Sequence, residues 1–234
     1  VEMLAGQEFM EMTGRFDLAA AGQAANEAAA GSAFGRYQDR KADNTLRTQR
    51  AGLGLFAAYL GAVGVEVDAA LLVEEPDAWQ GVTWGLVDGF VVWMIREGYS
   101  IASVNQRLSV VKTYARQAAR AGTLSAAELT LIRTVEGYSR EEGRRKDDRR
   151  QTTRRSPKKA EAVGLTPAQL KALKQQPDTP QGRRDRVLVC LLADHGLRVG
   201  EAARLRVEDL DLAEGRMTFY RPKVGLTQNH ELSE

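Results

Sequence analysis

Residues 191–211 read LLADHGLRVGEAARLRVEDLD, and this stretch decides the fold. An apolar helix is expected at about residues 183–195, and Gly196 can adopt the left-handed conformation that closes it. Arg198 then opens a second helix. Glu201 follows three residues later, so the two side chains share one helical face and can pair. A strand is expected at the end of the stretch.

The pairing of Arg198 with Glu201 has a chemical meaning. An arginine that is fixed at a helix start and held by a carboxylate can offer its planar guanidinium as a bidentate donor to a phosphate. The helix start adds N–H groups at the same place. An ordinary helix-turn-helix with a surface Arg–Glu pair remains the alternative, because such exposed pairs are common and contribute little to stability.

The whole stretch resembles the first catalytic box of the tyrosine recombinases, the phage integrase family. The family pattern is an apolar helix, then G-L-R-x-x-E, a spaced leucine and D-[IL]-D at the entrance of a small sheet. The residues on this pattern are Gly196, Leu197, Arg198, Glu201, Leu205, Asp209, Leu210 and Asp211. The resemblance implies a mainly α fold. It consists of a helical, SAM-like core-binding bundle followed by the first part of an α+β catalytic domain, in which helices accompany a small antiparallel sheet.

The length suggests about two domains, and the near-neutral charge hides an uneven distribution. The 234 residues carry a formal net charge of +2. Residues 1–35 hold five acidic residues and one basic residue, whereas residues 140–159 hold ten basic and four acidic residues. This basic centre indicates an anionic partner more clearly than the total charge does.

The cysteine content and the hydropathy predict a cytoplasmic location. The single cysteine, Cys190, excludes an internal disulfide and lies in an apolar run, where a small buried side chain is expected. No apolar run approaches the roughly 18 residues of a membrane span, and the N-terminus lacks a signal-peptide pattern. We therefore expect no membrane partner.

Changes in composition divide the chain into four parts. Residues 1–43 are rich in alanine and glycine and are expected to form a flexible leader of unknown role. Residues 44–139 are expected to form a helical domain, residues 140–159 a basic linker, and residues 160–234 a second domain. The helical patterns of the first domain cover residues 44–61, 84–95, 100–121 and 125–137, with a looser segment before residue 81.

The helix expected at residues 100–121 separates its faces most clearly. Its inner stripe is apolar and contains Val104, Leu108, Val111, Ala115 and Ala118. Its outer face has no acidic residue and contains Gln106, Ser109, Thr113, Arg116 and Arg120. By its pattern, the bundle resembles the family's core-binding domain, which forms half of a clamp around duplex DNA. The resemblance makes Gln106, Thr113, Arg116 and Arg120 candidate DNA contacts, and a solvated helix face remains the alternative.

The linker at residues 140–159 supplies further candidate DNA contacts. They are Arg144, Arg145, Arg149, Arg150, Arg154 and Arg155. Each basic side chain beside DNA can neutralise a phosphate and release a counterion. The density of like charge predicts an extended conformation, and the family resemblance implies that the linker lies along DNA. A solvated charge run is the alternative.

The second domain is expected to begin with a helix that Thr166 caps. Two strands are expected, at Leu210–Leu212 and Met217–Tyr220. A turn then holds Lys223, and a third strand is expected to begin at Leu232.

The resemblance assigns chemical roles to three residues. In the family, a tyrosine attacks a DNA phosphate and forms a 3′-phosphotyrosyl link that keeps the energy of the broken bond, so neither a metal nor another cofactor is implied. Arg198 takes the place of the first phosphate-binding arginine and Glu201 that of its supporting carboxylate. Lys223 takes the place of the hairpin lysine that protonates the leaving 5′ oxygen. The implied partner is double-stranded DNA, with homo-oligomers on DNA for the full-length protein and no small-molecule substrate.

The sequence departs from the family pattern after Lys223. In the family, an H-x-x-R box, a further His or Trp and the nucleophilic tyrosine follow the lysine, and none of them occurs in residues 224–234. His195 and His230 are expected to be non-catalytic. We therefore expect a C-terminally truncated recombinase with an incomplete catalytic-domain core, which binds DNA without cleaving it. A non-catalytic helical DNA-binding or regulatory protein is the alternative.

Overall fold

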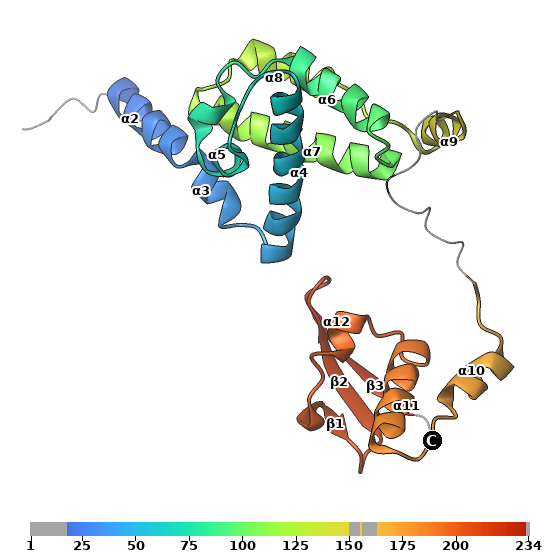
Figure 1. Cartoon of the computed structure of the whole chain (residues 1–234). Coiled ribbons are helices and arrows are strands. Elements are labelled where there is room, and N and C mark those ends of the chain that lie inside the picture. Colours follow the sequence, from blue (N-terminus) through green and yellow to red (C-terminus); the bar gives the residue numbers. More distant parts are fainter. Residues whose placement is uncertain (1–17, 150–154, 156–162, 233–234) are drawn as a thin grey trace, which may run out of the picture. The chain divides into compact units, whose positions relative to one another are not determined.

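The computed structural model describes residues 18–149, 155 and 163–232 (Figure 1). The chain has two compact units, Val1–Lys158 and Lys159–Glu234. The first unit is helical and the second combines helices with a small antiparallel sheet, which confirms the predicted fold class. In the described ranges, no helix has both the length and the apolar character needed to cross a membrane.

The helices of the first unit begin and end at residues with standard capping chemistry. The hydroxyls of Ser100 and Ser125 accept hydrogen bonds from backbone N–H groups in the first turns of their helices, and Gly122 ends the longer helix with a φ of +85°. The elements are α2 (Leu18–Gly31), α3 (Ala33–Gln38), α4 (Asp43–Ala62), α5 (Ala69–Glu74), the 3-10 helix η1 (Pro76–Trp79), α6 (Trp84–Arg96), α7 (Ile101–Ala121), α8 (Ala126–Thr134) and α9 (Arg140–Asp148).

Helix α7 is the centre of the first unit, since α2, α3, α4, α6, α8 and α9 all contact it (Figure 1). The predicted inner stripe is confirmed, because all five of its side chains are buried. Tyr114, also on α7, is fully buried and lies edge-on to Phe34 and Tyr37, with ring centroids 5.6 Å apart in both pairs. The sequence pattern of one amphipathic helix thus fixes where the core lies.

The expected flexible leader is only partly correct, because its last helix belongs to the core. Ala33 and Phe34 in α3 are buried, and Phe34 packs against Tyr114. Helix α2 buries no residue, as its alanine-rich sequence predicts. Residues 1–17 lie outside the described residues. The boundary expected at residue 43 therefore does not separate a flexible part from a folded one, since Phe34 and Tyr37 both pack against Tyr114 and dock the short helix α3.

The segment before residue 81 is also more ordered than its sequence predicts. It contains α5 and η1, and Trp79 in η1 is fully buried. The Trp79 indole N–H donates to the backbone carbonyl of Leu72 at 3.0 Å. Burial of one large aromatic with a satisfied polar group orders a segment that has no helical periodicity.

The predicted extended linker begins as a helix instead. Ser139 and Glu142 form a reciprocal capping box at the start of α9, and Glu141 pairs with Arg145 one turn later. Gly143 is buried, and a Cβ added there would lie 3.0 Å from the Ile101 side chain, so α9 packs closely on α7. These local interactions outweigh the repulsion of the basic residues. Of the linker beyond residue 149, only Arg155 is described.

The second unit packs short helices on a three-stranded antiparallel sheet of order β1-β2-β3 (Figure 1). Its elements are α10 (Pro167–Lys174), α11 (Pro180–Ala193), α12 (Val199–Ala202), the 3-10 helix η2 (Val207–Asp209), β1 (Leu210–Asp211), β2 (Arg216–Arg221) and β3 (Leu226–Glu231). The expected start of the third strand at Leu232 is wrong. The strand starts at Leu226, because the turn after Arg221 is tight and pairs Arg221 with Leu226.

The core of the second unit is thin. Among the described residues it contains four buried apolar side chains, those of Leu191, Leu197, Met217 and Phe219. In contrast, Val187, Leu188 and Leu192 on α11 stay largely exposed. The sheet and α12 are thus held by few apolar contacts, and local hydrogen bonds matter correspondingly more.

Candidate nucleic-acid interface

The predicted pair of Arg198 and Glu201 is formed. Gly196 takes a φ of +63°, the chain turns, and Arg198 becomes the N-cap of α12. One Glu201 oxygen accepts from the Arg198 guanidinium Nη1 at 2.7 Å, and the other accepts from the Arg198 backbone N–H at 2.9 Å. The Glu201 side chain is only 5% exposed, whereas that of Arg198 is 53% exposed. The carboxylate therefore fixes both ends of Arg198 and leaves most of its guanidinium open to solvent.

The electrostatics keep Glu201 ionised. The pKa of its carboxyl lies below the ordinary glutamate value, chiefly because the Arg198 backbone N–H donates to it, and also because the Arg198 side chain and the charge of Arg221 stabilise the anion. Burial acts in the opposite direction. An ionised, buried Glu201 holds the guanidinium in one orientation, which suits a phosphate oxygen approaching from the solvent side.

Arg221 is a residue of this site that the sequence reasoning missed. Its guanidinium lies over the Phe219 ring, 5.0 Å from the centroid, and its Nε is buried with no hydrogen-bond partner in the described part of the chain. The period of two residues in β2 could have identified Arg221. Met217, Phe219 and Arg221 occupy every second position and face inward. An arginine on the inner face of a strand next to the Arg198–Glu201 pair adds a second positive charge to the site.

Lys223 lies where the hairpin prediction places it. It is exposed in the turn of residues 222–225 that joins β2 to β3. Within the described part of the chain, it forms no hydrogen bond or ion pair, so its ammonium is available to a ligand. His195 and His230 lie with ring centroids 5.6 Å apart, and His230 packs edge-on to Phe219.

The outer face of α7 forms a polar ridge between two hollows. The first hollow lies toward α4 and is lined by Asn44, Thr45, Thr48, Gln49, Gln106, Ser109 and Val110. The second is lined by Asn105, Leu108, Ser109, Lys112, Thr113, Arg116 and Gly137. Gln106 and Arg116 are exposed, Thr113 is half-buried, and Ser109 borders both hollows. No Asp or Glu occurs among the described residues that line either hollow.

Lys112 adds a partly buried charge to the second hollow. Its Nζ donates to the backbone carbonyl of Arg133 at 3.0 Å. Burial lowers the pKa of this lysine, and the nearby Glu136 opposes that effect. The ammonium is thus held in a fixed position at the edge of the ridge. Arg120, the last predicted contact of α7, lines a separate hollow at the other end of the helix.

The candidate contacts of the linker divide into three groups. Arg144 and Arg145 are exposed on α9, and Arg149 is the residue that ends this helix. Arg150 and Arg154 lie outside the described residues. Arg155 is not free, because its guanidinium pairs with the Glu97 carboxylate, donates to the backbone carbonyl of Glu97 at 2.7 Å and lies over the Tyr99 ring. A phosphate would have to compete with Glu97 for Arg155.

The described residues contain no cluster of three or more His, Cys, Asp or Glu side chains that could hold a metal ion. Beside the Glu201 carboxylate, the groups that these surfaces present to solvent include guanidinium, ammonium, hydroxyl and amide donors. These are the donors that proteins direct at phosphate and sugar oxygens of nucleic acids.

Comparison with known proteins indicates the family. The model of the phage integrase family matches residues 164–234, which include the Arg198–Glu201 pair and the hairpin of Lys223. The chain is 31% identical over 191 residues to the tyrosine recombinase XerD of Ralstonia nicotianae, a match that covers 80% of this chain and 51% of XerD. Residues 164–234 carry the domain of the phage integrase family, and the chain resembles the tyrosine recombinase XerD over most of its own length. It spans about half the length of this XerD relative.

Two further comparisons cover less of the chain or are more distant. The type 1 fimbriae regulatory protein FimE of Escherichia coli K12 is 43% identical over 51 residues, which are 22% of this chain and 26% of FimE. A solved structure of the Tn1549 transposon integrase with a circular intermediate DNA aligns with a TM-score of 0.45 and 15% identity, over 78% of this chain and 61% of that one.

Proposed function

We propose that this chain binds duplex DNA through the outer face of α7 and presents Arg198 to a DNA phosphate. The observation that supports DNA binding is the ridge of Gln106, Ser109, Thr113 and Arg116 between two hollows whose described lining contains no acid. Exposed hydroxyls, amides and cations without intervening carboxylates suit a polyanion, since like charges would repel it.

The catalytic roles proposed for the second unit follow from the geometry of its donors. Arg198 would hold a nonbridging phosphate oxygen while Glu201 keeps its guanidinium oriented. Lys223, exposed in its turn, would supply a proton to the leaving 5′ oxygen during strand exchange. These groups stabilise charge and transfer a proton without a cofactor.

The polypeptide of residues 1–234 would bind DNA without cleaving it. Its residues after Lys223 include no tyrosine and no H-x-x-R box, so they supply neither the nucleophile nor the second phosphate-binding arginine of the family. A nicked duplex, which traps covalent intermediates of tyrosine recombinases, provides the test. Denaturing gels should show no protein–DNA adduct, and an adduct resistant to boiling in detergent would overturn this part of the proposal.

Salt-dependent binding tests the DNA interface itself. Fluorescence anisotropy with a labelled duplex should show a Kd that rises steeply with salt, with a slope of about 0.9 per phosphate contact in a plot of logarithms. Arg116→Ala should lower that slope by about one contact. Arg96→Ala removes the same charge from an exposed position that lines neither hollow, and it should leave the slope unchanged. Equal slopes for the two variants would refute the interface.

A non-catalytic regulatory role is the second candidate, favoured by the match of 51 residues to a protein named as a regulator. The two candidates differ in their dependence on Arg198. In a recombinase that also contains the family's nucleophilic tyrosine and H-x-x-R box, replacement of Arg198 by alanine would abolish strand cleavage. A regulator would keep its DNA-dependent effect with either residue at position 198. Either role would place the protein in the cytoplasm, with homo-oligomers on DNA as the proposed assembly.

A further inference from the structure

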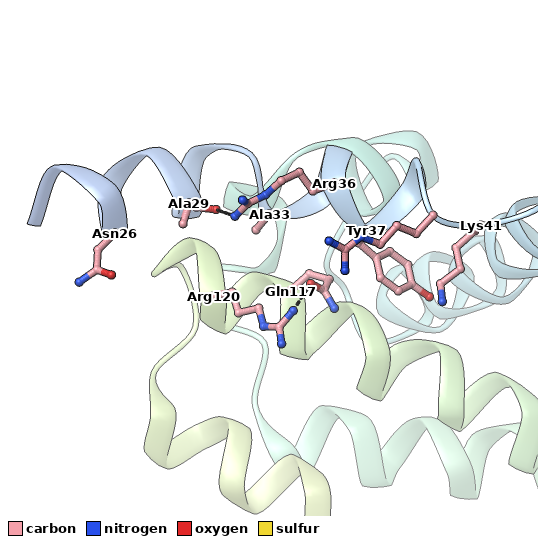
Figure 2. Close-up of a pocket in the computed structure, with 9 residues that line it drawn as sticks. Asn26, Ala29, Ala33, Arg36, Tyr37, Lys41, Gln117 and Arg120 are labelled. Atoms are coloured by element: carbon pink, nitrogen blue, oxygen red, sulfur yellow. Dashed lines mark hydrogen bonds between the residues drawn. The ribbon is translucent and has the colours of Figure 1, made fainter. Parts of the chain in front are cut away.

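The segment expected to be a leader forms one wall of a basic hollow on the first unit. Residues from α2, α3 and the turn before α4 line one side, and Gln117 and Arg120 of α7 line the other (Figure 2). The hollow has a volume of about 590 Å³ and is open to solvent. Its position at the C-terminal end of α7 places it at the opposite end of that helix from Gln106.

Four cationic side chains converge on this hollow, and no acidic residue occurs in its described lining. They are Arg36, Arg40, Lys41 and Arg120. Asp39 and Asp43 flank the basic run in the sequence, yet neither lines the hollow. Convergence of four like charges is unfavourable without an anion between them, and the remaining lining offers amide and phenol groups from Asn26, Gln117 and Tyr37.

Local contacts hold part of this wall in place. Arg36 donates to the backbone carbonyl of Ala29 at 3.2 Å, and the Lys41 ammonium lies 5.0 Å from the centroid of the Tyr37 ring (Figure 2). The Arg120 Nη1 donates to the side-chain oxygen Oε1 of Gln117 at 3.5 Å. The wall itself is fixed to the bundle because Phe34 and Tyr37 pack against Tyr114 of α7. The cations are therefore presented by a folded surface.

We propose that this hollow binds the sugar-phosphate backbone of DNA as a second anchor beyond the α7 ridge, with Arg40 and Lys41 contacting consecutive phosphates. The proposal rests on the proposed DNA binding and extends it to the turn between α3 and α4. A volume of about 590 Å³ exceeds what a single phosphate fills and accommodates a short stretch of backbone. The guanidinium and ammonium groups recognise phosphate without reading sequence, so the anchor fixes position rather than specificity.

The test compares two charge-matched double variants of the full chain. Arg40→Ala with Lys41→Ala removes two exposed cations of the hollow, and Arg96→Ala with Arg133→Ala removes two exposed cations outside it. Binding to a labelled duplex is measured over a salt series. The hollow variant should lose about two phosphate contacts, a reduction in slope of about 1.8, while the control keeps the slope of the unaltered chain. Circular dichroism checks that both variants remain folded.

The outcomes separate this inference from the proposed function. Absence of duplex binding by the unaltered chain would overturn both. Binding by the unaltered chain, with the same slope in the hollow variant, would overturn only the second anchor. A titration with inorganic phosphate completes the experiment. If it saturated the hollow at micromolar concentration, with shifts of the Arg40 and Lys41 amide resonances, the hollow would be a small-anion site, and the DNA anchor would be refuted.

Discussion

Replacement of Tyr114 by phenylalanine should stabilise the first unit. The Tyr114 side chain is fully buried, and its hydroxyl has no hydrogen-bond partner among the residues that the structure describes. A buried hydroxyl without a partner costs roughly 1–3 kcal/mol of desolvation that the folded state does not recover. Tyr114→Phe removes this group and keeps the edge-on ring contacts with Phe34 and Tyr37. The free energy of unfolding should therefore rise by about 1–2 kcal/mol.

Tryptophan fluorescence measures this change in the first unit alone. The three tryptophans, Trp79, Trp84 and Trp93, all lie in that unit, so urea titration of the full chain reports its unfolding separately from the second unit. The midpoint should rise with an unchanged slope. A fall in stability by 1 kcal/mol or more would refute the reasoning, because it would mean that the hydroxyl makes a favourable interaction in the folded protein.

The same variant should alter the response to alkali. Burial raises the pKa of Tyr114 from 10.0 to about 12. Since the folded state holds the phenol proton more tightly, its stabilising effect is complete below pH 10 and is lost as the pH rises toward 12. Two pKa units correspond to about 3 kcal/mol. Unaltered protein should lose up to this amount in that window, and Tyr114→Phe should lose correspondingly less. Parallel losses would contradict the burial of the phenol.

Three further predictions concern individual contacts. Phe34→Ala should lower the free energy of unfolding by about 3–5 kcal/mol and release α3 from the bundle. Amide hydrogen exchange would detect the release as lost protection at residues 33–38. Unchanged protection there would contradict the docking of α3 by Phe34. Ser139→Ala should remove the capping box of α9 at a cost of about 1 kcal/mol, seen as faster exchange at residues 140–148 with no change in α7. The pKa of Glu201 is lower in the folded state than the ordinary glutamate value. The ionised carboxylate therefore stabilises the fold above the ordinary pKa, and this stabilisation is lost as the pH falls through the pKa of the folded state. Glu201→Gln should remove this acid-dependent part, and the resonances of the two histidines, both in the second unit, would report it.

The sequence predicts most accurately where local chemistry and periodicity agree. The ends of α7 follow from Ser100 and Gly122, and its buried stripe follows from the helical repeat. The Arg198–Glu201 pair follows from a spacing of three residues beside a glycine with positive φ. In the caps and in the ion pair, a short stretch contains all the interacting groups, and the stripe needs only the helical repeat, so no knowledge of distant residues is needed.

Features that depend on distant partners could not be predicted in this way. Phe34 docks an alanine-rich segment because Tyr114, 80 positions away in the sequence, supplies the other ring. β3 contains only one apolar residue, Leu226, so its sequence lacks the alternation of a half-buried strand, and its pairing with β2 defines it. Arg155, expected to face DNA, instead pairs with Glu97, a contact that depends on the return of the chain to the end of α6.

The central claim is that the outer face of α7 lies on duplex DNA, and site-specific photo-cross-linking tests it most directly. Ser109 borders both hollows of the ridge, so a benzophenone side chain at this position should cross-link to a bound duplex. The same group at Val92, an exposed position of α6 that lines neither hollow, should give no cross-link. Cross-linking at Val92 but not at Ser109 would contradict the account and place the DNA on a different face of the bundle.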